Sequence, residues 1–460
     1  MINQVPVDLA ELFRRSGIDG RVSMLFRLEQ EPGAMVPQSI AGLGAEIELD
    51  LCLAAQYFAS ATGNLAPWGT VMQFMQCTDR SAVLHRFTGS SIAGRDEEAS
   101  SGLSGQFAKC IGIGFMAQYG DAIWFYPLPK KGTARIETTH GKVVVRRSVT
   151  GRRWPDYLAA ASQVGQLPNP CFALEFKGQA AYVDFSRKSF IGWVEQSKNI
   201  SVVGADGRPL GIESWVLAFN YRCAGKTATH EASTLLAHDP WVGPRDAEPF
   251  AEGGSIVRAH LARQMRMLGL RRLAQLVLTG GRPRQDISYP QTYTIRHAGC
   301  RDRRYVGRFF ALGPDGILRP ASLAVGASLL PSTDVRVEVR GRPGRFWTCC
   351  MRGTDRARMI HVHADIYDSG GLLTKGQVRE WCRSLLSGRS DLVFVGQDAG
   401  MVRGCLSISD ELDLAGDAFN EAPEFHSVDD RADGGFVQVI RNGSLIASSQ
   451  LVEIDREPIW

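Results

Sequence analysis

The chain has 460 residues, of which 44% are hydrophobic and 22% charged, and its formal net charge is +4. The length exceeds what one core usually serves, and the composition excludes a disordered or fibrous protein. No apolar run reaches the roughly 18–20 residues that cross a bilayer, and the first residues lack a secretory signal pattern. We expect a multidomain cytoplasmic protein, without membrane association, whose ten scattered cysteines are reduced and buried.

Apolar periodicity and turn residues predict the elements of the chain in order. Helices are predicted over residues 8–15, 45–61 and 155–164, and strands over residues 22–28, 70–77 and 110–115. Residues 88–105, rich in Ser and Gly, are predicted to be a loop. Pro155 suits the first turn of the helix that it precedes.

Glycine-centred turns predict five β-hairpins, because Asn-Gly and Asp-Gly accept the positive φ of tight turns. The paired segments are 134–138 with 142–149, 172–176 with 180–185, 201–204 with 210–219, 309–312 with 317–318, and 436–440 with 444–448. Around Gly269, residues 255–268 and 270–277 carry two apolar stripes of different phase, which indicates two short helices or one bent helix. A further helix is predicted over residues 377–386.

Antiparallel, hairpin-rich sheets with a few packed helices, an α+β class, fit this order better than alternating βαβ units. Three prolines within residues 240–249 indicate a boundary near 245, and a second is placed near 355. The predicted sections are residues 1–245, an amino-terminal α+β part; 246–355, a basic helix plus β section; and 356–460, an acidic carboxy-terminal α+β section.

Charge is distributed unevenly along the chain. Residues 251–360 carry 20 Arg or Lys against 7 Asp or Glu, whereas residues 361–460 carry 8 against 17 and the first 250 residues are balanced. No acidic residue lies between Glu252 and Asp286, although seven arginines do. Such a concentration of guanidinium groups predicts an anionic partner.

We predict that this central section binds nucleic acid through phosphate contacts and aromatic stacking, without cofactor and without chemistry of its own. The predicted binding residues are Arg258, Arg263, Arg266, Arg271, Arg272, Arg282, Arg284, Arg303, Arg304, Arg308, Tyr305 and Trp347. Either DNA or RNA fits this hypothesis. The alternative is an assembly or scaffold subunit, whose basic section docks the acidic section of a protein partner or of a second copy.

A third reading is a metal-dependent hydrolase or nuclease. On a strand, His361, His363 and Asp365 would share one face and could ligate a divalent metal. The His-x-His pair resembles the metal motif of amidohydrolases, PHP-type phosphoesterases and HUH nucleases. Only 97 residues follow His363, too few for a catalytic barrel, and no tyrosine follows Tyr367 as a nucleophile.

A degenerate phosphate-binding loop is the last candidate. Lys226 and Thr227 follow a strand-like segment and precede a helix-like one, which is the context of a Walker A motif. However, Asn220 stands where that motif has a small residue, and Gly225 is the single loop glycine. Helix capping by Thr227 is therefore the preferred interpretation. No complete motif for nucleophilic catalysis is found.

Overall fold

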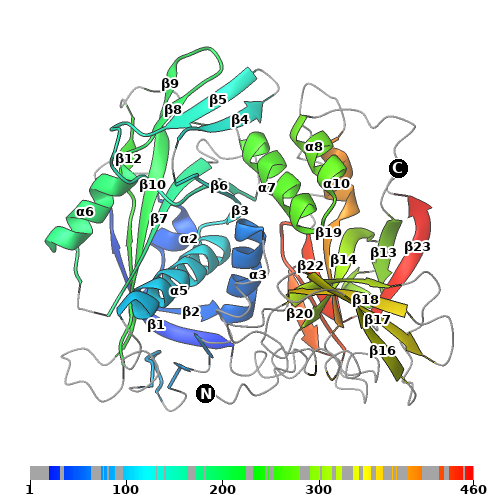
Figure 1. Ribbon diagram of the computed structural model, residues 1–460. Coiled ribbons are helices and arrows are strands. Elements are labelled where there is room, and N and C mark those ends of the chain that lie inside the picture. Colours follow the sequence, from blue (N-terminus) through cyan, green and yellow to red (C-terminus); the bar gives the residue numbers. More distant parts are fainter. Residues whose placement is uncertain are drawn as a thin grey trace. The chain divides into compact units, whose positions relative to one another are not determined.

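The computed structural model describes residues 20–31, 36–63, 74–75, 77–79, 82–88, 97–130, 132–138, 141–162, 171–180, 183–223, 232–243, 247, 250, 253–279, 291–300, 303–312, 318–323, 335–340, 346–353, 359–365, 376, 380, 392–406, 424–428, 435–448 and 451–458. These residues form a mixed protein of helices and mostly antiparallel strands, which confirms the predicted α+β class (Figure 1). The chain divides into two compact units. We call Asp19–Arg284 with Gly404–Ala422 the α/β unit, and Met1–Ile18, Gln285–Arg403 and Pro423–Trp460 the β unit.

The α/β unit is built on an eight-stranded sheet with the order β2-β1-β11-β10-β7-β6-β3, and β12 pairs with β10. Its strands are β1 (Arg21–Glu29), β2 (Glu46–Asp50), β3 (Ala122–Pro127), β6 (Tyr157–Ala161), β7 (Cys171–Gln179), β10 (Ile212–Asn220), β11 (Thr234–His238) and β12 (Trp241–Val242). The pairs β1–β11 and β7–β10 are parallel and the others antiparallel. A four-stranded sheet contains β4 (Ala134–Thr138), β5 (Gly141–Arg146), β8 (Ser201–Val203) and β9 (Pro209–Leu210).

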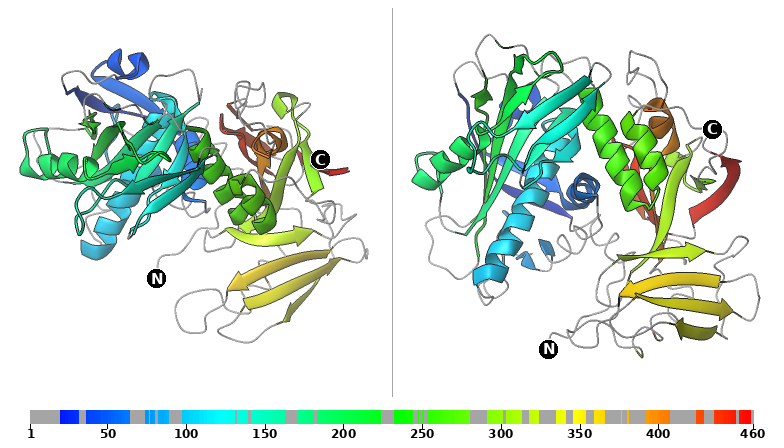
Figure 2. Two further views of the ribbon diagram at one scale, coloured as in Figure 1. Left: turned by 90° about the horizontal axis from the view of Figure 1, so that it is seen from above. Right: turned by 45° about the horizontal axis from the view of Figure 1, so that its top comes forward.

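Helices cover both faces of the large sheet (Figures 1 and 2). The helices of this unit are α2 (Gln38–Ala41), α3 (Leu51–Thr62), α5 (Glu97–Gln118), α6 (Lys188–Ser197), α7 (Gly253–Met267) and α8 (Arg271–Thr279), of which α8 packs against α7. A Cβ at Gly178 would lie 2.1 Å from the Ser104 carbonyl oxygen, and one at Gly112 would lie 2.2 Å from the Phe176 ring. Helix α5 therefore packs against β7 at a distance that only glycine permits, while α6 covers the opposite face with Phe190 against Val216.

The β unit contains an eleven-stranded antiparallel sheet. Its elements are β13 (Gln291–Ile295), the 3-10 turn η1 (Ala298–Cys300), β14 (Tyr305–Leu312), β15 (Leu318–Leu323), β16 (Val335–Arg340), β17 (Phe346–Gly353), β18 (Met359–Asp365), β19 (Leu392–Asp398), α10 (Ala399–Gly404), β20 (Phe425–Val428), β21 (Phe436–Val439), β22 (Ser444–Ser448) and β23 (Val452–Pro458). Asp398 begins α10 by accepting hydrogen bonds from the backbone of Gly400 and Met401 at 2.7 and 3.1 Å.

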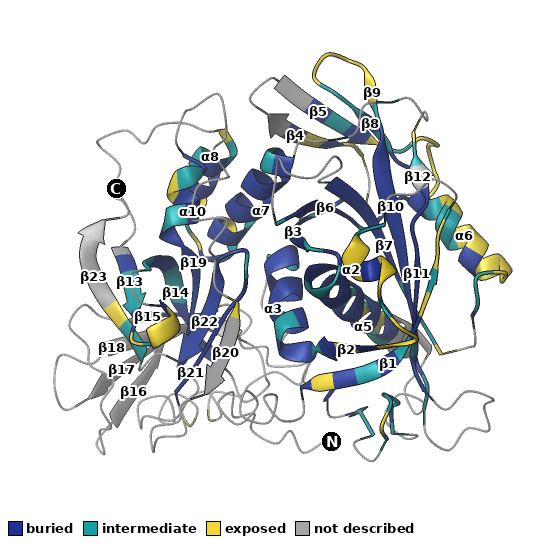
Figure 3. Ribbon diagram, turned by 180° about the vertical axis from the view of Figure 1, so that it is seen from behind, coloured by how far each residue is buried: buried dark blue, intermediate teal, exposed yellow. Residues whose placement is uncertain are grey.

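Burial follows the sheet order. Every residue of β6 and of β10 is buried, whereas α6 keeps an exposed outer side, where Ile191 is 52% exposed (Figure 3). Strands buried on both faces are mostly apolar, and charged residues buried within this sheet, Glu175 of β7 and Glu213 of β10, are exceptions. No helix in the described part of the chain is both long and apolar enough to span a membrane.

Several predicted elements are confirmed. The strand over residues 22–28 is β1, and the hairpins around the turns at 139–140, 313–317 and 441–443 are β4–β5, β14–β15 and β21–β22. The central stretch forms two helices, α7 and α8, separated by Gly269 with a φ of 79°. In each case the local signal, a turn glycine or a change of helical phase, agrees with the strand pairing or the helix boundary in the structure.

Other predictions for the amino-terminal part are wrong in whole or in part. The helix expected over residues 45–61 is confirmed from Leu51 onward as α3, but its first part is the strand β2; α3 begins where Asp50 accepts hydrogen bonds from the backbone of Cys52 and Leu53. The loop expected over residues 88–105 ends in the first turns of α5, and the strand expected over 110–115 lies inside that helix. The small residues of α5 allow close packing, and this outweighs their low helix propensity.

Two further corrections affect the functional site. The helix expected over residues 155–164 is β6, and the hairpin expected around Lys177 and Gly178 is the continuous strand β7. Gly178 is a contact point for α5 and not a turn residue. Of the hairpin expected over 201–219, only β8 and β9 pair, because β10 joins the large sheet parallel to β7. Residues 8–15 and most of 70–77 and 377–386 lie outside the described residues.

Candidate functional site

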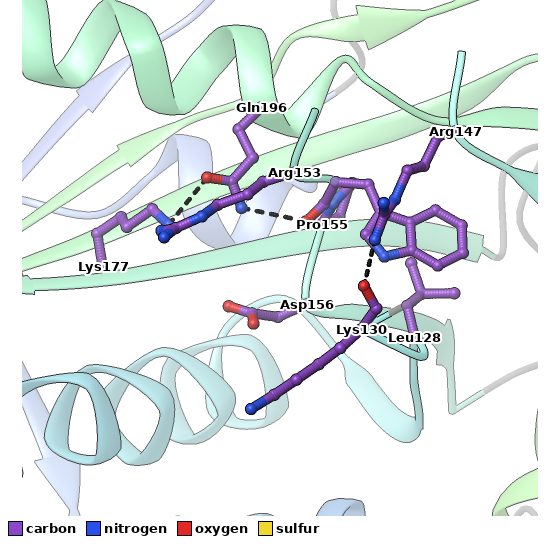
Figure 4. Close-up of a pocket in the computed structure, with 9 residues that line it drawn as sticks. Leu128, Lys130, Arg147, Arg153, Pro155, Asp156, Lys177 and Gln196 are labelled. Atoms are coloured by element: carbon purple, nitrogen blue, oxygen red, sulfur yellow. Dashed lines mark hydrogen bonds between the residues drawn. The ribbon is translucent and has the colours of Figure 1, made fainter. Parts of the chain in front are cut away.

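A pocket of about 410 Å³ opens in the α/β unit where β6, β7 and α6 meet (Figure 4). It is lined by four cations and one carboxylate together with apolar and amide side chains: Leu128, Lys130, Arg147, Arg153, Trp154, Pro155, Asp156, Lys177 and Gln196. This excess of positive charge around one acidic group marks the pocket as a site for an anionic ligand.

Asp156 immediately precedes β6 and is fixed by its backbone and its side chain. Its N–H donates to the Leu174 carbonyl at 2.9 Å, and its own carbonyl accepts from the Leu128 N–H at 2.9 Å. The Oδ1 atom pairs with the Lys109 ammonium of α5 at 3.0 Å, and Oδ2 accepts from the Phe176 N–H at 3.3 Å. The carboxylate is 26% exposed, so it is held in place and still reaches the pocket.

Glu175 lies on the neighbouring strand, β7, and its side chain is completely buried. In the parallel register it pairs with Val216 of β10, so it lies on the face of the sheet that α6 covers. Burial, followed by the nearby charge of Asp156, raises the pKa of Glu175 to about 8. Its Oε1 atom contacts the Lys177 ammonium, whereas Oε2 has no hydrogen-bond partner among the described residues. A buried carboxyl with this perturbation is a candidate for a functional group.

Lys177 follows Glu175 by two residues and therefore lies on the same face of β7. Besides Glu175, its ammonium donates to Gln196 Oε1 of α6 at 3.0 Å, and Gln196 Nε2 donates to the Trp154 carbonyl at 3.1 Å. Figure 4 shows these two hydrogen bonds side by side. An ammonium has three N–H donors, so one donor remains after Glu175 and Gln196 are satisfied.

The opposite wall of the pocket is basic, and it is held rigidly. The Arg147 guanidinium lies 5.3 Å from the centre of the Trp154 ring and donates to the Lys130 carbonyl. Asn199, 5% exposed, accepts from the Val149 N–H at 2.7 Å and donates to the Arg153 carbonyl at 2.8 Å. Two residues of the core, Trp154 and Asn199, therefore position the loop that carries the cations.

Asp156 of the lining and the buried Glu175 behind it are the two carboxylates here that could hold a divalent cation. Magnesium ions in proteins are often held by one or two carboxylates, with water and substrate phosphate completing the shell. Asp156 immediately precedes β6 and Glu175 lies on the adjacent strand β7, near enough for the charge of Asp156 to raise the pKa of Glu175, whose Oε2 atom has no hydrogen-bond partner among the described residues. Among the described residues, no group of three or more His, Cys, Asp or Glu side chains could hold a metal ion.

The predicted arginines of the central section have different environments. Arg258 is buried, at 7% exposure, and burial lowers its pKa. Arg263 donates from two nitrogens to the Thr62 carbonyl and packs against Gly63, so it ends α3. The others on these helices, Arg266, Arg271 and Arg272, are exposed. Arg282 and Arg284 lie outside the described residues.

The remaining predicted binding residues belong to the β unit. Arg303 pairs with the buried carboxylate of Asp398 at 2.8 Å, and Arg304 and Arg308 are half-buried. Tyr305 is fully buried at 0% exposure, so its ring cannot stack on a base, and we remove it from the predicted set. Trp347 lies in β17, and the structure describes its backbone only. The predicted surface is thus divided between two units.

The two alternative motifs stay predictions. His361, His363 and Asp365 lie on β18, opposite Cys350, Thr348 and Phe346 of β17, so their positions share one face as expected. The side chains of these three residues lie outside the described part of the structure. Lys226 and Thr227 also lie outside it.

The sequence contains a signal for the pocket that is lost when charge is counted over the first 250 residues together. Between Lys130 and Arg153 there are eight Lys or Arg and one Glu, although the first 250 residues are balanced overall. Two residues after this run comes Pro155-Asp156, and then Glu175 and Lys177 spaced by one residue. The signal for this pocket is therefore a basic run followed by Asp156 immediately before one strand and by Glu175 and Lys177 on the next strand.

Comparison with known proteins does not add a relationship: no family model, curated protein or solved structure matches this chain.

Proposed function

We propose that the protein is a divalent-metal-dependent hydrolase of phosphodiester bonds in nucleic acid, with its site at Asp156, Glu175 and Lys177. The observation that carries the proposal is the buried carboxyl of Glu175, which lies behind the pocket wall, pairs with Lys177 of the lining and is near the lining carboxylate of Asp156. Burying a carboxyl is costly even with one ammonium beside it, and the pKa of Glu175 stays raised despite Lys177, which favours a functional role.

Each residue has a role that follows from its contacts. Asp156 and Glu175 would hold the cation, which supplies charge stabilisation to the phosphoryl group and lowers the pKa of a bound water. The remaining N–H of Lys177 faces a pocket that it lines, where it can donate to a phosphate oxygen or hold a proton near the reacting group. Lys109 orients the Asp156 carboxylate through their 3.0 Å ion pair.

This proposal adds chemistry to the nucleic-acid binding predicted from the sequence and moves its centre to the pocket. A phosphodiester is the substrate class that the charges favour, because four lining cations would attract a polyanion. Exposed Arg266, Arg271 and Arg272 remain candidates for additional backbone contacts. A pure binding protein would not need a buried carboxyl beside a second one.

The test is a cleavage assay with the full chain on plasmid DNA, single-stranded DNA and RNA, in Mg²⁺ or Mn²⁺ and in EDTA. We expect metal-dependent cleavage of at least one substrate, reduced roughly 10²–10⁴-fold in Asp156→Asn, Glu175→Gln and Lys177→Gln. Asp206→Asn, in an exposed turn of the same unit, serves as the control and should cleave normally. Cleavage that survives EDTA, or that all three variants retain, would contradict the proposal.

A further inference from the structure

The pocket holds more positive charge than the reaction at Asp156 and Glu175 requires. Lys130, Arg147 and Arg153 line it in addition to Lys177, and none of the three forms an ion pair with a described residue. Lys130 and Arg153 are exposed, so water can compensate their charge and an anion can reach them. By contrast, Arg263 of α7 is committed to the Thr62 carbonyl.

The basic wall is ordered before any ligand arrives. The guanidinium of Arg147 is held by the Trp154 ring and the Lys130 carbonyl, and its Nε atom is buried without a hydrogen-bond partner among the described residues. Asn199 fixes the backbone of Val149 and Arg153. Because the Arg147 guanidinium and the backbone around Arg153 are already placed, less conformational entropy is lost when this wall binds an anion.

We infer that Lys130, Arg147 and Arg153 form a subsite for a second phosphate of the substrate, one that is not hydrolysed. The inference rests on the proposed function and specifies it further: the preferred substrate is a polynucleotide, not an isolated phosphodiester. Guanidinium groups contact phosphate oxygens through paired N–H donors, and successive phosphates along one strand lie close enough to occupy one pocket. Phosphate contacts carry no sequence information, so cleavage should tolerate any sequence.

The experiment compares two substrates with the full-length protein and Mn²⁺. Bis(p-nitrophenyl) phosphate offers a single phosphate, and a short fluorescent oligonucleotide offers several. In the double variant Lys130→Gln/Arg153→Gln, we expect the ratio of the two kcat/KM values, oligonucleotide over diester, to fall roughly 10–100-fold, mainly through the oligonucleotide KM. The double variant Arg135→Gln/Arg208→Gln, at exposed positions outside the pocket lining, should keep the wild-type ratio.

Salt dependence gives a second measurement of the same interactions. The slope of log affinity against log salt for a single strand should decrease by about 0.7 for each phosphate that the variant no longer neutralises. Arg147→Gln tests the third cation, with thermal unfolding to confirm that the weaker packing on Trp154 leaves the protein folded. An unchanged substrate ratio together with an unchanged salt slope in these variants would overturn the subsite.

The outcomes separate the inference from the proposed function. If neither substrate is hydrolysed, the proposed function fails. The subsite is then tested by oligonucleotide binding in EDTA, where Lys130→Gln/Arg153→Gln should bind more weakly than wild type if the subsite exists. If both substrates are hydrolysed with the same ratio in all variants, the hydrolase stands and the subsite does not.

Discussion

Glu175 is the residue on which the energetics of the site depend. Its carboxyl ordinarily ionises near pH 4.5, yet burial and Asp156 raise its pKa to about 8 in the folded protein. The folded state therefore holds a proton that the unfolded chain releases throughout this interval. The free energy of unfolding must then fall as pH rises from about 4.5 to 8, because the folded state binds more protons there.

The first prediction follows from this linkage. Without metal, wild-type protein should lose up to about 1.4 kcal/mol of stability per pH unit from this group between pH 5 and 8, and Glu175→Gln should lack that contribution. Urea unfolding at pH 5, 6, 7 and 8 measures it, with Asp206→Asn as the control. Parallel stability curves for wild type and Glu175→Gln would show that Glu175 is ionised in the folded protein at neutral pH.

The second prediction concerns metal binding. Since a carboxylate must be deprotonated to bind a cation, Mn²⁺ should displace about one proton at pH 6.5 and bind roughly tenfold more tightly for each pH unit up to about 8. Calorimetry in buffers of different ionisation enthalpy counts the released protons. Proton release that persists in Glu175→Gln would assign it to another group.

At the scale of elements, the contact between α5 and β7 places the site. Gly178 continues the strand that carries Glu175 and Lys177, and the Ser104 carbonyl of α5 lies where a Cβ would be. The same helix carries Lys109, which pairs with Asp156. A change in the spacing between this helix and this strand would thus move Lys109 relative to Asp156, whose carboxylate also accepts a hydrogen bond from Phe176 of β7.

The third prediction uses two glycines. Gly178→Ala should destabilise the protein by about 1–3 kcal/mol, because the added methyl overlaps the Ser104 carbonyl oxygen, and should reduce cleavage as α5 is displaced. Gly192→Ala is the matched control: it lies in α6 with open space around it, so better helix propensity should stabilise the protein by about 0.5–1 kcal/mol. Chemical unfolding measures both, and equal effects of the two substitutions would refute the packing argument.

The elements also explain how much of the site could be predicted. The class of fold and three of the five hairpins could be predicted from local turn residues, because the strands on either side of these turns pair with each other in the structure. The site could not be predicted, because Pro155 suggested a helix and Gly178 suggested a turn, and these assignments placed Asp156 and Glu175 on unrelated elements. Asp156 is held by long-range contacts with β7 and α5, and Gly178 is a contact point for α5; local periodicity is insensitive to both.

At the scale of the whole molecule, the chain forms two units, and all residues of the proposed site belong to the α/β unit. The predicted central binding surface, in contrast, has Arg266 in that unit and Arg308 in the β unit. The section boundaries expected near residues 245 and 355 remain predictions. Charge counted along the sequence is therefore a weak guide to charge gathered on a surface.

The fourth prediction is that thermal unfolding of the full chain proceeds in two steps, since separate cores can unfold separately. Mn²⁺ should raise the Tm of one step, by an amount that corresponds to about 2.7 kcal/mol at a hundred times the Kd. Glu175→Gln should abolish that shift and leave the Tm of the other step unchanged. A metal effect of equal size on both steps would place the binding site elsewhere.

The proposed site draws all its side chains from residues 109–196, a continuous part of the chain in which β6 and β7 are consecutive strands. The sheet also contains the parallel pair β1–β11, which joins Leu25 to Thr234. Closing a short loop costs less conformational entropy than closing a long one. The strands around the pocket can therefore pair early in folding, whereas the β1–β11 pair, which joins distant segments, forms later. Newly made chains should then acquire the cleft early, and substitutions around it should slow folding more than they speed unfolding.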